Sequence, residues 1–197
     1  MSSVRYVSVH DLPGTLPLCS AAQAAALVRS GDKIAMSANA NTPRAFLEAL
    51  FARAEQLEQV EIMHMRLVGT FPAATPALAR HIRWNPLLVS LALRQGVAAG
   101  YVDYTPGHFH QISSFFAEGL RHLDVTVISV APPSADGTCS YGAYVGFMDQ
   151  ARRVARTVIA EVNSAMPQTY GPVRFPLACA DAVIAPMRRC QNKPGQC

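Results

Sequence analysis

Charged residues, and lysine in particular, are scarce in this 197-residue sequence. Charged side chains make up 15% of it and the lysines are Lys33 and Lys193, so the net charge of +4 comes almost wholly from arginine. The arginines form no basic stripe interleaved with aromatic residues, which argues against a nucleic-acid-binding protein. Positive charge of this kind suits an anionic small molecule, although scattered, solvated arginines are the simpler explanation.

Long apolar runs and paired cysteine motifs are also missing. No stretch approaches the length of a membrane-spanning helix, and the first residues contain neither a basic cluster nor a long apolar segment, so we expect no membrane anchor and no signal peptide. The five cysteines include no C-x-x-C pair, which argues against a zinc site and favours a reducing cytoplasm. His108 and His110 flank one residue, but no further ligands are evident, so we expect no metal.

Apolar residues, by contrast, make up 50% of the chain. A single domain of this length buries roughly 70% of the surface that its unfolded chain exposes. We expect this domain to span residues 1–186, with a flexible, polar and basic tail over residues 187–197. The apolar surplus indicates either a large sheet covered on both faces or a surface that is buried against a partner.

The stretch from residue 124 to residue 171 predicts a strand–helix–strand unit. Residues 125–130 form a β-branched run typical of a buried strand, and two prolines then end it. Apolar residues at nearly helical spacing over 145–155 predict a helix, and residues 157–162 form a second strand. Segments of this length make one βαβ unit, in which the two strands run parallel.

The same alternation extends through the rest of the chain. A capping box at Ser20 predicts a helix over residues 21–29, followed by a strand over 32–37. Thr42 as N-cap and Pro43 as first helical residue predict a helix that reaches about residue 54. The remaining expected elements are strands over 60–65, 82–89 (broken at Asn85-Pro86), 101–105 and 182–185, and helices over 91–99 and 112–120.

This order of elements predicts an α/β fold with an open, mainly parallel sheet and helices on both faces, of Rossmann-like topology. In open α/β sheets, ligands bind beyond the carboxyl ends of the strands. Residues 131–142 and 163–171 follow two of those ends, so we expect the functional site there.

These two loops carry a recognisable pattern of residues. Its members, in order, are Pro132, Pro133, Gly137, Ser140 and Gly142, and then Asn163, Met166, Pro167, Thr169 and Gly171. The pattern resembles the acetyl-CoA hydrolase/transferase family, which includes the 4-hydroxybutyrate and acetate CoA-transferases. The resemblance is to the amino-terminal domain of that family and covers residues 21–171; after Gly171 the sequence departs from the family pattern.

The resemblance implies a reaction that moves CoA from an acyl-CoA to a free carboxylate. Members of the family use a glutamate that attacks the thioester, passing through an acyl anhydride and an enzyme-bound glutamyl-CoA thioester. That glutamate belongs to the second domain, so no catalytic residue is carried over to this chain, whose glutamates all have ordinary explanations. The implied ligands are an acyl-CoA, with CoA as substrate rather than as a tightly bound cofactor, and a small carboxylate.

The loops after the strands supply the candidate substrate-binding residues. They are Asn41, Thr42, Gly69, Thr70, Asn163, Met166 and Pro167. From the residues alone, Asn41 and Thr42 are better explained as turn and cap residues, whereas the resemblance implies that their loop faces the acyl group. A glycine at position 69 lets a ligand approach the backbone closely. His64, in an apolar strand, is expected to be a hydrogen-bonded core histidine.

Several functional hypotheses remain open. The chain is the amino-terminal half of a CoA-transferase that acts only with a carboxy-terminal domain, a truncated product without activity, or a non-catalytic partner that binds an acyl group or an anion. In each case the isolated chain is expected to be inactive and to bind a second domain or itself. A sugar-phosphate isomerase is a weaker alternative, because no acid–base pair of carboxylates is evident.

Overall fold

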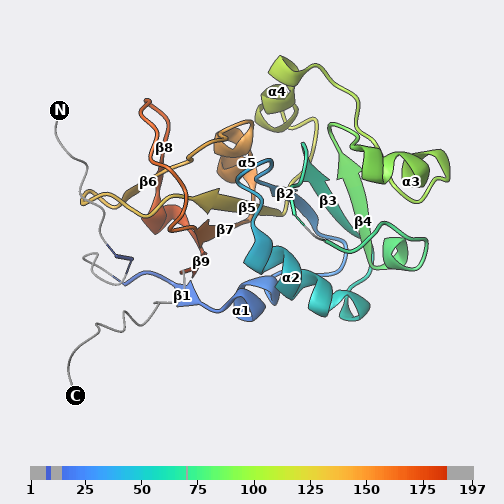
Figure 1. The fold of residues 1–197 in the computed structure, drawn as a ribbon, viewed down its shortest axis with the longest axis horizontal. Coiled ribbons are helices and arrows are strands. Elements are labelled where there is room, and N and C mark those ends of the chain that lie inside the picture. The colour runs from blue at the N-terminus through green and yellow to red at the C-terminus, as the bar shows by residue number, and fades with distance from the viewer. Residues whose placement is uncertain (1–7, 10–14, 70, 186–197) are drawn as a thin grey trace, which may run out of the picture.

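A seven-stranded parallel sheet forms the centre of the computed structural model, which describes residues 8–9, 15–69 and 71–185 (Figure 1). The strand order is β1-β9-β7-β5-β2-β3-β4, and every neighbouring pair is parallel. The strands are β1 (Leu18–Cys19), β2 (Lys33–Met36), β3 (Val60–His64), β4 (Ile82–Pro86), β5 (Val125–Val130), β7 (Thr157–Val162) and β9 (Ala182–Ile184). The predicted α/β class and the parallel sheet are confirmed.

Helices cover both faces of this sheet (Figure 1). They are α1 (Ala21–Ala25), α2 (Arg44–Ala52), α3 (Arg94–Ala98), α4 (Ile112–Ala117) and α5 (Met148–Val154), with short 3-10 turns at Ala54–Gln56, Leu78–Arg80, Leu91–Leu93, Phe109–Gln111 and Leu177–Cys179. Apolar side chains of α1 and α2 form one core with the sheet, whereas those of α4 and α5 form a second core. Because every residue of β5 is buried, this strand is covered on both sides, as its β-branched run predicts.

Of the two helix starts predicted from capping residues, one is confirmed and one is wrong. The capping box at Ser20 is present, although α1 ends at Ala25 rather than Arg29. The predicted N-cap at Thr42 is wrong, because Pro43 occupies that position and no side chain there caps α2. The Thr42 hydroxyl instead donates to the Asn39 carbonyl (2.8 Å) and accepts from the Val68 amide (2.9 Å). Thr42 therefore joins the loop after β2 to the loop after β3.

Two strand predictions need correction. The segment expected over residues 82–89, with a break at Asn85-Pro86, is a strand only as far as Pro86, where β4 ends. Because β4 is an edge strand, it tolerates a proline as its last residue. Residues 101–105 form no strand: Val102 packs against Gly96, and only the amides of Asp103 and Thr105 donate to β4 carbonyls.

One pair of strands has no counterpart among the predictions. β6 (Thr138–Ser140) and β8 (Arg174–Pro176) form a separate antiparallel pair. Each has only three residues, and their partner segments lie far apart in the chain, so neither gives a clear alternating pattern. This pair lies next to the carboxyl end of β5, because the Ala131 amide donates to the Ser140 carbonyl (2.9 Å).

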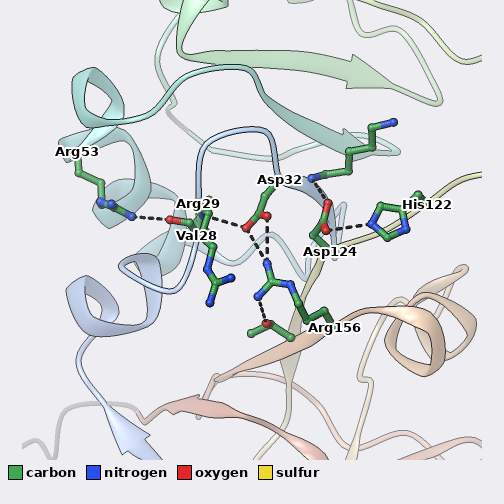
Figure 2. Close-up of polar contacts among 9 residues, drawn as sticks. Val28, Arg29, Asp32, Arg53, His122, Asp124 and Arg156 are labelled. Carbon is green, nitrogen blue, oxygen red and sulfur yellow. Dashed lines mark hydrogen bonds and ion pairs between the residues drawn. The ribbon is translucent and has the colours of Figure 1, made fainter.

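Polar contacts join the amino ends of the central strands (Figure 2). Asp32 accepts from the Arg29 amide and from the Arg156 guanidinium, at 2.9 Å and 3.0 Å. Asp124 accepts from the Lys33 amide (2.9 Å) and pairs with His122 (3.0 Å). Each of the three strands β2, β5 and β7 is directly preceded by one member of this network: Asp32, Asp124 and Arg156, respectively. The network therefore fixes the starts of three adjacent strands.

The expected tail over residues 187–197 lies outside the described residues. Within the described part of the chain, no helix has the length and apolar character that crossing a bilayer requires.

Candidate functional site

A cleft of about 790 Å³ opens at the carboxyl edge of the sheet. Its walls come from the starts of α1 and α2 and from the ends of β7 and β9. The residues with polar or charged side chains that line it are Ser20, Thr42, Arg44, Glu48, Glu161, Asn163 and Ser164. The position agrees with the rule that ligands of parallel sheets bind beyond the carboxyl ends of the strands.

Two of the predicted site residues, Thr42 and Asn163, line this cleft. Asn163 directly follows β7, and its side-chain carbonyl accepts from the Ala165 amide (2.9 Å). This contact uses the oxygen of the side chain, whereas its NH₂ group has no hydrogen-bond partner among the described residues. Asn163 thus lines the cleft with an unengaged donor, while the hydroxyl of Thr42 is already engaged with two backbone groups.

Asn41 and Met166 lie inside the protein rather than on the cleft surface. The fully buried Asn41 amide donates to the backbone carbonyls of Ser129, Tyr141 and Tyr144. It therefore holds the loop after β2 against the end of β5 and against the segment before α5. Its Oδ1 atom is buried without a hydrogen-bond partner.

The other predicted residues occupy different places. Gly69 is exposed beside the cleft, and a β-carbon there would approach the Arg44 Nε atom to 3.2 Å. Pro167 is exposed in the loop after β7 and does not line the cleft. Thr70 lies outside the described residues. The assignment of all seven residues to substrate binding remains a prediction.

The residues of the sequence pattern meet in space and join the two loops. Ser140 Oγ accepts from the amides of Thr169 (3.1 Å) and Gly142 (3.0 Å). The Thr169 hydroxyl in turn donates to the Gly142 carbonyl (3.1 Å). Gly142 has a φ of +64°, and a β-carbon on it would collide with the Met166 side chain. This part of the pattern is therefore explained by loop packing.

Glu161 is a cleft residue that the sequence analysis treated as ordinary. Its carboxylate accepts from the amides of Phe46 (2.9 Å) and Ala45 (3.4 Å), at the start of α2. Burial raises the pKa of this carboxyl above its usual range, and the nearby charge of Glu48 acts in the same direction, against the lowering effect of the backbone amides. The sequence signal was a single charged residue in an otherwise apolar strand, directly before the loop of interest.

The histidines behave differently from one another. His64 is buried, but neither ring nitrogen has a hydrogen-bond partner, so the expectation of a hydrogen-bonded core histidine is wrong. Its ring packs edge-on against Trp84 at 5.3 Å, and burial lowers its pKa to about 3. His108 and His110 stack on each other at 5.7 Å. Among the described residues, no group of three or more His, Cys, Asp or Glu is placed to hold a metal ion.

Comparison with known proteins identifies relatives over most of the chain. The family description "Acetyl-CoA hydrolase/transferase N-terminal domain" matches residues 15–186. The chain is 32% identical over 167 residues to the 4-hydroxybutyrate coenzyme A transferase of Clostridium kluyveri, covering 85% of this chain and 39% of the relative. It is 30% identical to the succinyl-CoA:cyclohexane-1-carboxylate CoA transferase of Geobacter metallireducens, covering 85% and 38%.

Solved structures give the same picture. The 4-hydroxybutyrate CoA-transferase of Porphyromonas gingivalis has a TM-score of 0.70 at 27% identity, covering 85% of this chain and 38% of that one. RipA of Yersinia pestis has a TM-score of 0.75 at 25% identity, covering 85% and 42%. A chain of the decarboxylase AibA/AibB shares the fold with a TM-score of 0.56 at 12% identity, and there the match covers 84% of that chain.

The chain spans about two fifths of the length of the curated relatives that it matches. The matched region includes every described strand and helix, together with the cleft at the carboxyl edge. The chain therefore belongs to the acetyl-CoA hydrolase/transferase family, within which it corresponds to the amino-terminal domain.

Proposed function

We propose that this chain forms one wall of a CoA-transferase site that moves CoA between an acyl-CoA and a short carboxylic acid. The observation that supports this most directly is the cleft of about 790 Å³ at the carboxyl edge, which is bordered by Asn163 at the start of one of the loops that resemble the family. A domain outside this chain supplies the nucleophilic glutamate of the family mechanism. The described domain supplies the surface against which the acyl group and the acceptor acid lie.

Two groups on the cleft are suited to bind a carboxylate or a thioester carbonyl. Asn163 and Arg44 both line the cleft, and neither the Asn163 NH₂ group nor the Arg44 guanidinium has a hydrogen-bond partner among the described residues. A cation and an amide donor together complement a carboxylate by charge and by hydrogen bonding. Asn41 and Met166 act behind them, because both are buried and hold the loops that carry the cleft residues.

The remaining parts of the proposal concern ligands, partners and location. CoA takes part as a substrate and leaves with the product, and no tightly bound cofactor is required. The natural partner is a carboxy-terminal CoA-transferase domain, with self-association as the alternative. A cytoplasmic location agrees with the free thiols of Cys19, Cys139 and Cys179. Residues 1–186 act as the folded unit of this arrangement.

Carboxylate binding can be tested on the 197-residue chain by NMR titration with acetate and butyrate. We expect the largest amide shifts in the loops after β2 and β7. Asn163→Ala should weaken binding by about fivefold or more, since a hydrogen bond to a charged group is lost. Gln95→Ala, an exposed amide on α3, serves as the control and should bind as the wild type does. Shifts confined to other regions, or equal binding by both variants, would contradict the proposal.

The second candidate function is that of a non-catalytic binding partner. An assay of CoA-transferase activity distinguishes it from the first candidate, one half of a CoA-transferase site. The AibA/AibB match shows that a domain of this fold can make up most of a separate chain, as a partner subunit would. Exchange of labelled acetate into acetyl-CoA should be absent with this chain alone and should appear when a matching carboxy-terminal domain is added. Exchange by the chain alone would overturn the assignment of the nucleophile to another domain.

A further inference from the structure

The cleft has a different balance of charge from the rest of the chain. The chain carries a net charge of +4, whereas the cleft is lined by one arginine, Arg44, and two glutamates, Glu48 and Glu161. Cys19 also lines the cleft, and desolvation raises the pKa of its thiol, so this group stays neutral at pH 7. The cleft therefore holds two carboxyl groups beside a single cation.

Arg44 and Glu48 lie one helical turn apart on α2, so they share one face of this helix. Both residues are exposed, and among the described residues neither side chain forms a hydrogen bond or an ion pair. The positive charge of Arg44 is thus available to a ligand. The negative charge of Glu48 lies beside it on the cleft, and no described cation is in contact with it.

Glu161 adds a second carboxyl group, at the end of β7. It accepts from the amides of Phe46 (2.9 Å) and Ala45 (3.4 Å), so the donors at the start of α2 are already occupied. Burial raises the pKa of Glu161, and the charge of Glu48 acts in the same direction. Glu48 therefore acts electrostatically on the part of the cleft beside β7 as well as beside Arg44.

The unengaged donors of the cleft suffice for one carboxylate. The Arg44 guanidinium and the Asn163 NH₂ group can together bind the two oxygens of a single carboxylate. Ser164 adds a hydroxyl, which is neutral, and the Ser20 hydroxyl is already bonded to Gln23. A second carboxylate on the same ligand would have no cation of its own among the described residues of the cleft.

We propose that Glu48 makes the cleft select acids with one carboxylate over dicarboxylic acids of the same length. One carboxylate binds to Arg44 and Asn163, and a second, at the far end of the ligand, meets the carboxyl groups of Glu48 and Glu161. Such selectivity comes from repulsion of the wrong ligand rather than from better contacts with the right one. It rests on the proposed function, which places the acid in this cleft, and it adds the class of acid.

NMR titration of the 197-residue chain with monomethyl succinate and with succinate tests this selectivity, at a mildly alkaline pH where succinate is a dianion. The two acids have the same carbon backbone and differ in the charge of the far end. Wild-type protein should bind monomethyl succinate about two- to fivefold more tightly, because repulsion between charges at a solvent-exposed cleft is modest. Glu48→Gln should reduce this ratio of affinities, and Glu48→Lys should invert it.

Two controls separate the local charge of Glu48 from other causes. Glu58→Gln removes the same charge from an exposed residue just before β3, at the opposite edge of the sheet, and should leave the ratio of affinities as in the wild type. Added salt should bring the wild-type ratio closer to one, because screening weakens the repulsion between exposed charges.

Several outcomes would overturn the role of Glu48. These are equal binding of the two acids by the wild type, an unchanged ratio in both Glu48 variants, an equal change in Glu58→Gln, and a preference that persists at high salt. Net charge or ligand shape would then account for any selectivity, and the proposed function would still stand, since a carboxylate binds. If the wild type binds neither acid and does not bind butyrate, the proposed function fails as well.

Discussion

Gly142 combines two requirements at a single residue. Its φ of +64° lies in the left-handed region, and Met166 fills the space that a β-carbon would need. Glycine adopts this conformation without steric cost, and its missing side chain also allows the close approach. The residue therefore joins the two loops of the carboxyl edge by shape rather than by chemistry.

Replacing Gly142 with alanine should lower the free energy of unfolding by about 2 to 4 kcal/mol, since backbone strain and overpacking both contribute. Gly137→Ala is the matched control, because Gly137 has a φ of +76° but open space around it. The control should lose only the strain contribution, about 1 to 2 kcal/mol. Urea denaturation measures both. Adding Met166→Ala should partly rescue Gly142→Ala, and equal losses in the two glycine variants would exclude the contact with Met166 as a cause.

His64 is a second residue whose environment is unusual. Both ring nitrogens are buried without a partner, and burial lowers its pKa to about 3. The unfolded chain thus binds a proton more readily than the native state does. Burial favours the neutral ring, so the contribution of His64 to the free energy of unfolding is fully present above pH 6.5, its pKa in the unfolded chain. This contribution is lost as the pH falls toward 3, the pKa in the native state.

The wild-type protein should therefore lose up to about 1.4 kcal/mol of unfolding free energy per pH unit below 6.5 from this residue. His64→Phe should remove this dependence and, by eliminating unpaired polar atoms, leave stability at pH 7 unchanged or higher. Denaturation curves at pH 7, 6 and 5 give the comparison, with the exposed His108→Gln as control. If the free energy of unfolding of His64→Phe falls with decreasing pH as steeply as that of the wild type, other groups cause the acid sensitivity.

At the scale of elements, α2 starts without a side-chain cap of its own. The carboxylate of Glu161, at the end of β7, accepts from the Phe46 and Ala45 amides instead. A negative charge at a helix N-terminus interacts favourably with the helix dipole. This contact fixes the start of α2 against the sheet and so sets the position of Arg44 on the cleft.

Glu161→Gln should change the pH dependence of stability in a defined direction. Burial raises the pKa of Glu161, so the native state holds the proton more tightly than the unfolded chain. The unfolding free energy contributed by Glu161 is therefore highest below its unfolded pKa and falls as the pH rises through the folded pKa. As the pH rises through this range, the wild type loses unfolding free energy and Glu161→Gln does not. The free energy of unfolding of Glu161→Gln minus that of the wild type should therefore increase with pH, as measured by urea denaturation. The exposed Glu58→Gln is the control, and a fall in the difference would contradict the burial effect.

On the scale of the whole molecule, the two edges of the sheet are organised differently. At the amino edge, charged groups pair with each other, as Asp32 and Arg156 do across the start of β5 (Figure 2). At the carboxyl edge, by contrast, Arg44, Arg66 and Arg94 have no such partner among the described residues. One edge contributes to stability, and the other retains charge that is available to a ligand.

A double-mutant cycle on Asp32→Asn and Arg156→Gln tests the structural role of the amino edge. We expect a coupling free energy of about 1 kcal/mol or more, because the Asp32 side chain is 8% exposed and the contact joins distant strands. The pair Asp149 and Arg153, within α5, is the control, because the Arg153 side chain is 56% exposed and the two residues are four apart on one helix; it should give about 0.5 kcal/mol or less. Equal couplings in the two cycles would show that burial of Asp32 adds nothing.

Much of the architecture could be predicted because it follows from short-range patterns. The β-branched run of β5, the apolar periodicity of α2 and the capping box at Ser20 involve residues that are close in sequence. The antiparallel pair of β6 and β8 was missed because its strands are too short to show alternation. The general rule for parallel sheets predicted a site at the edge where the structure has a cleft, but the individual contacts there were not predictable.

The sequence by itself determined the alternation of strands and helices, the resemblance of the two loops to a known family and the edge of the sheet where a site is expected. The tertiary structure decided which residues line the cleft at that edge. Asn41 is buried by contacts with a segment 100 residues away, and Glu161 meets α2 across 115 residues. Such contacts depend on how strands are ordered in the sheet, and local propensity and periodicity carry no information about that order.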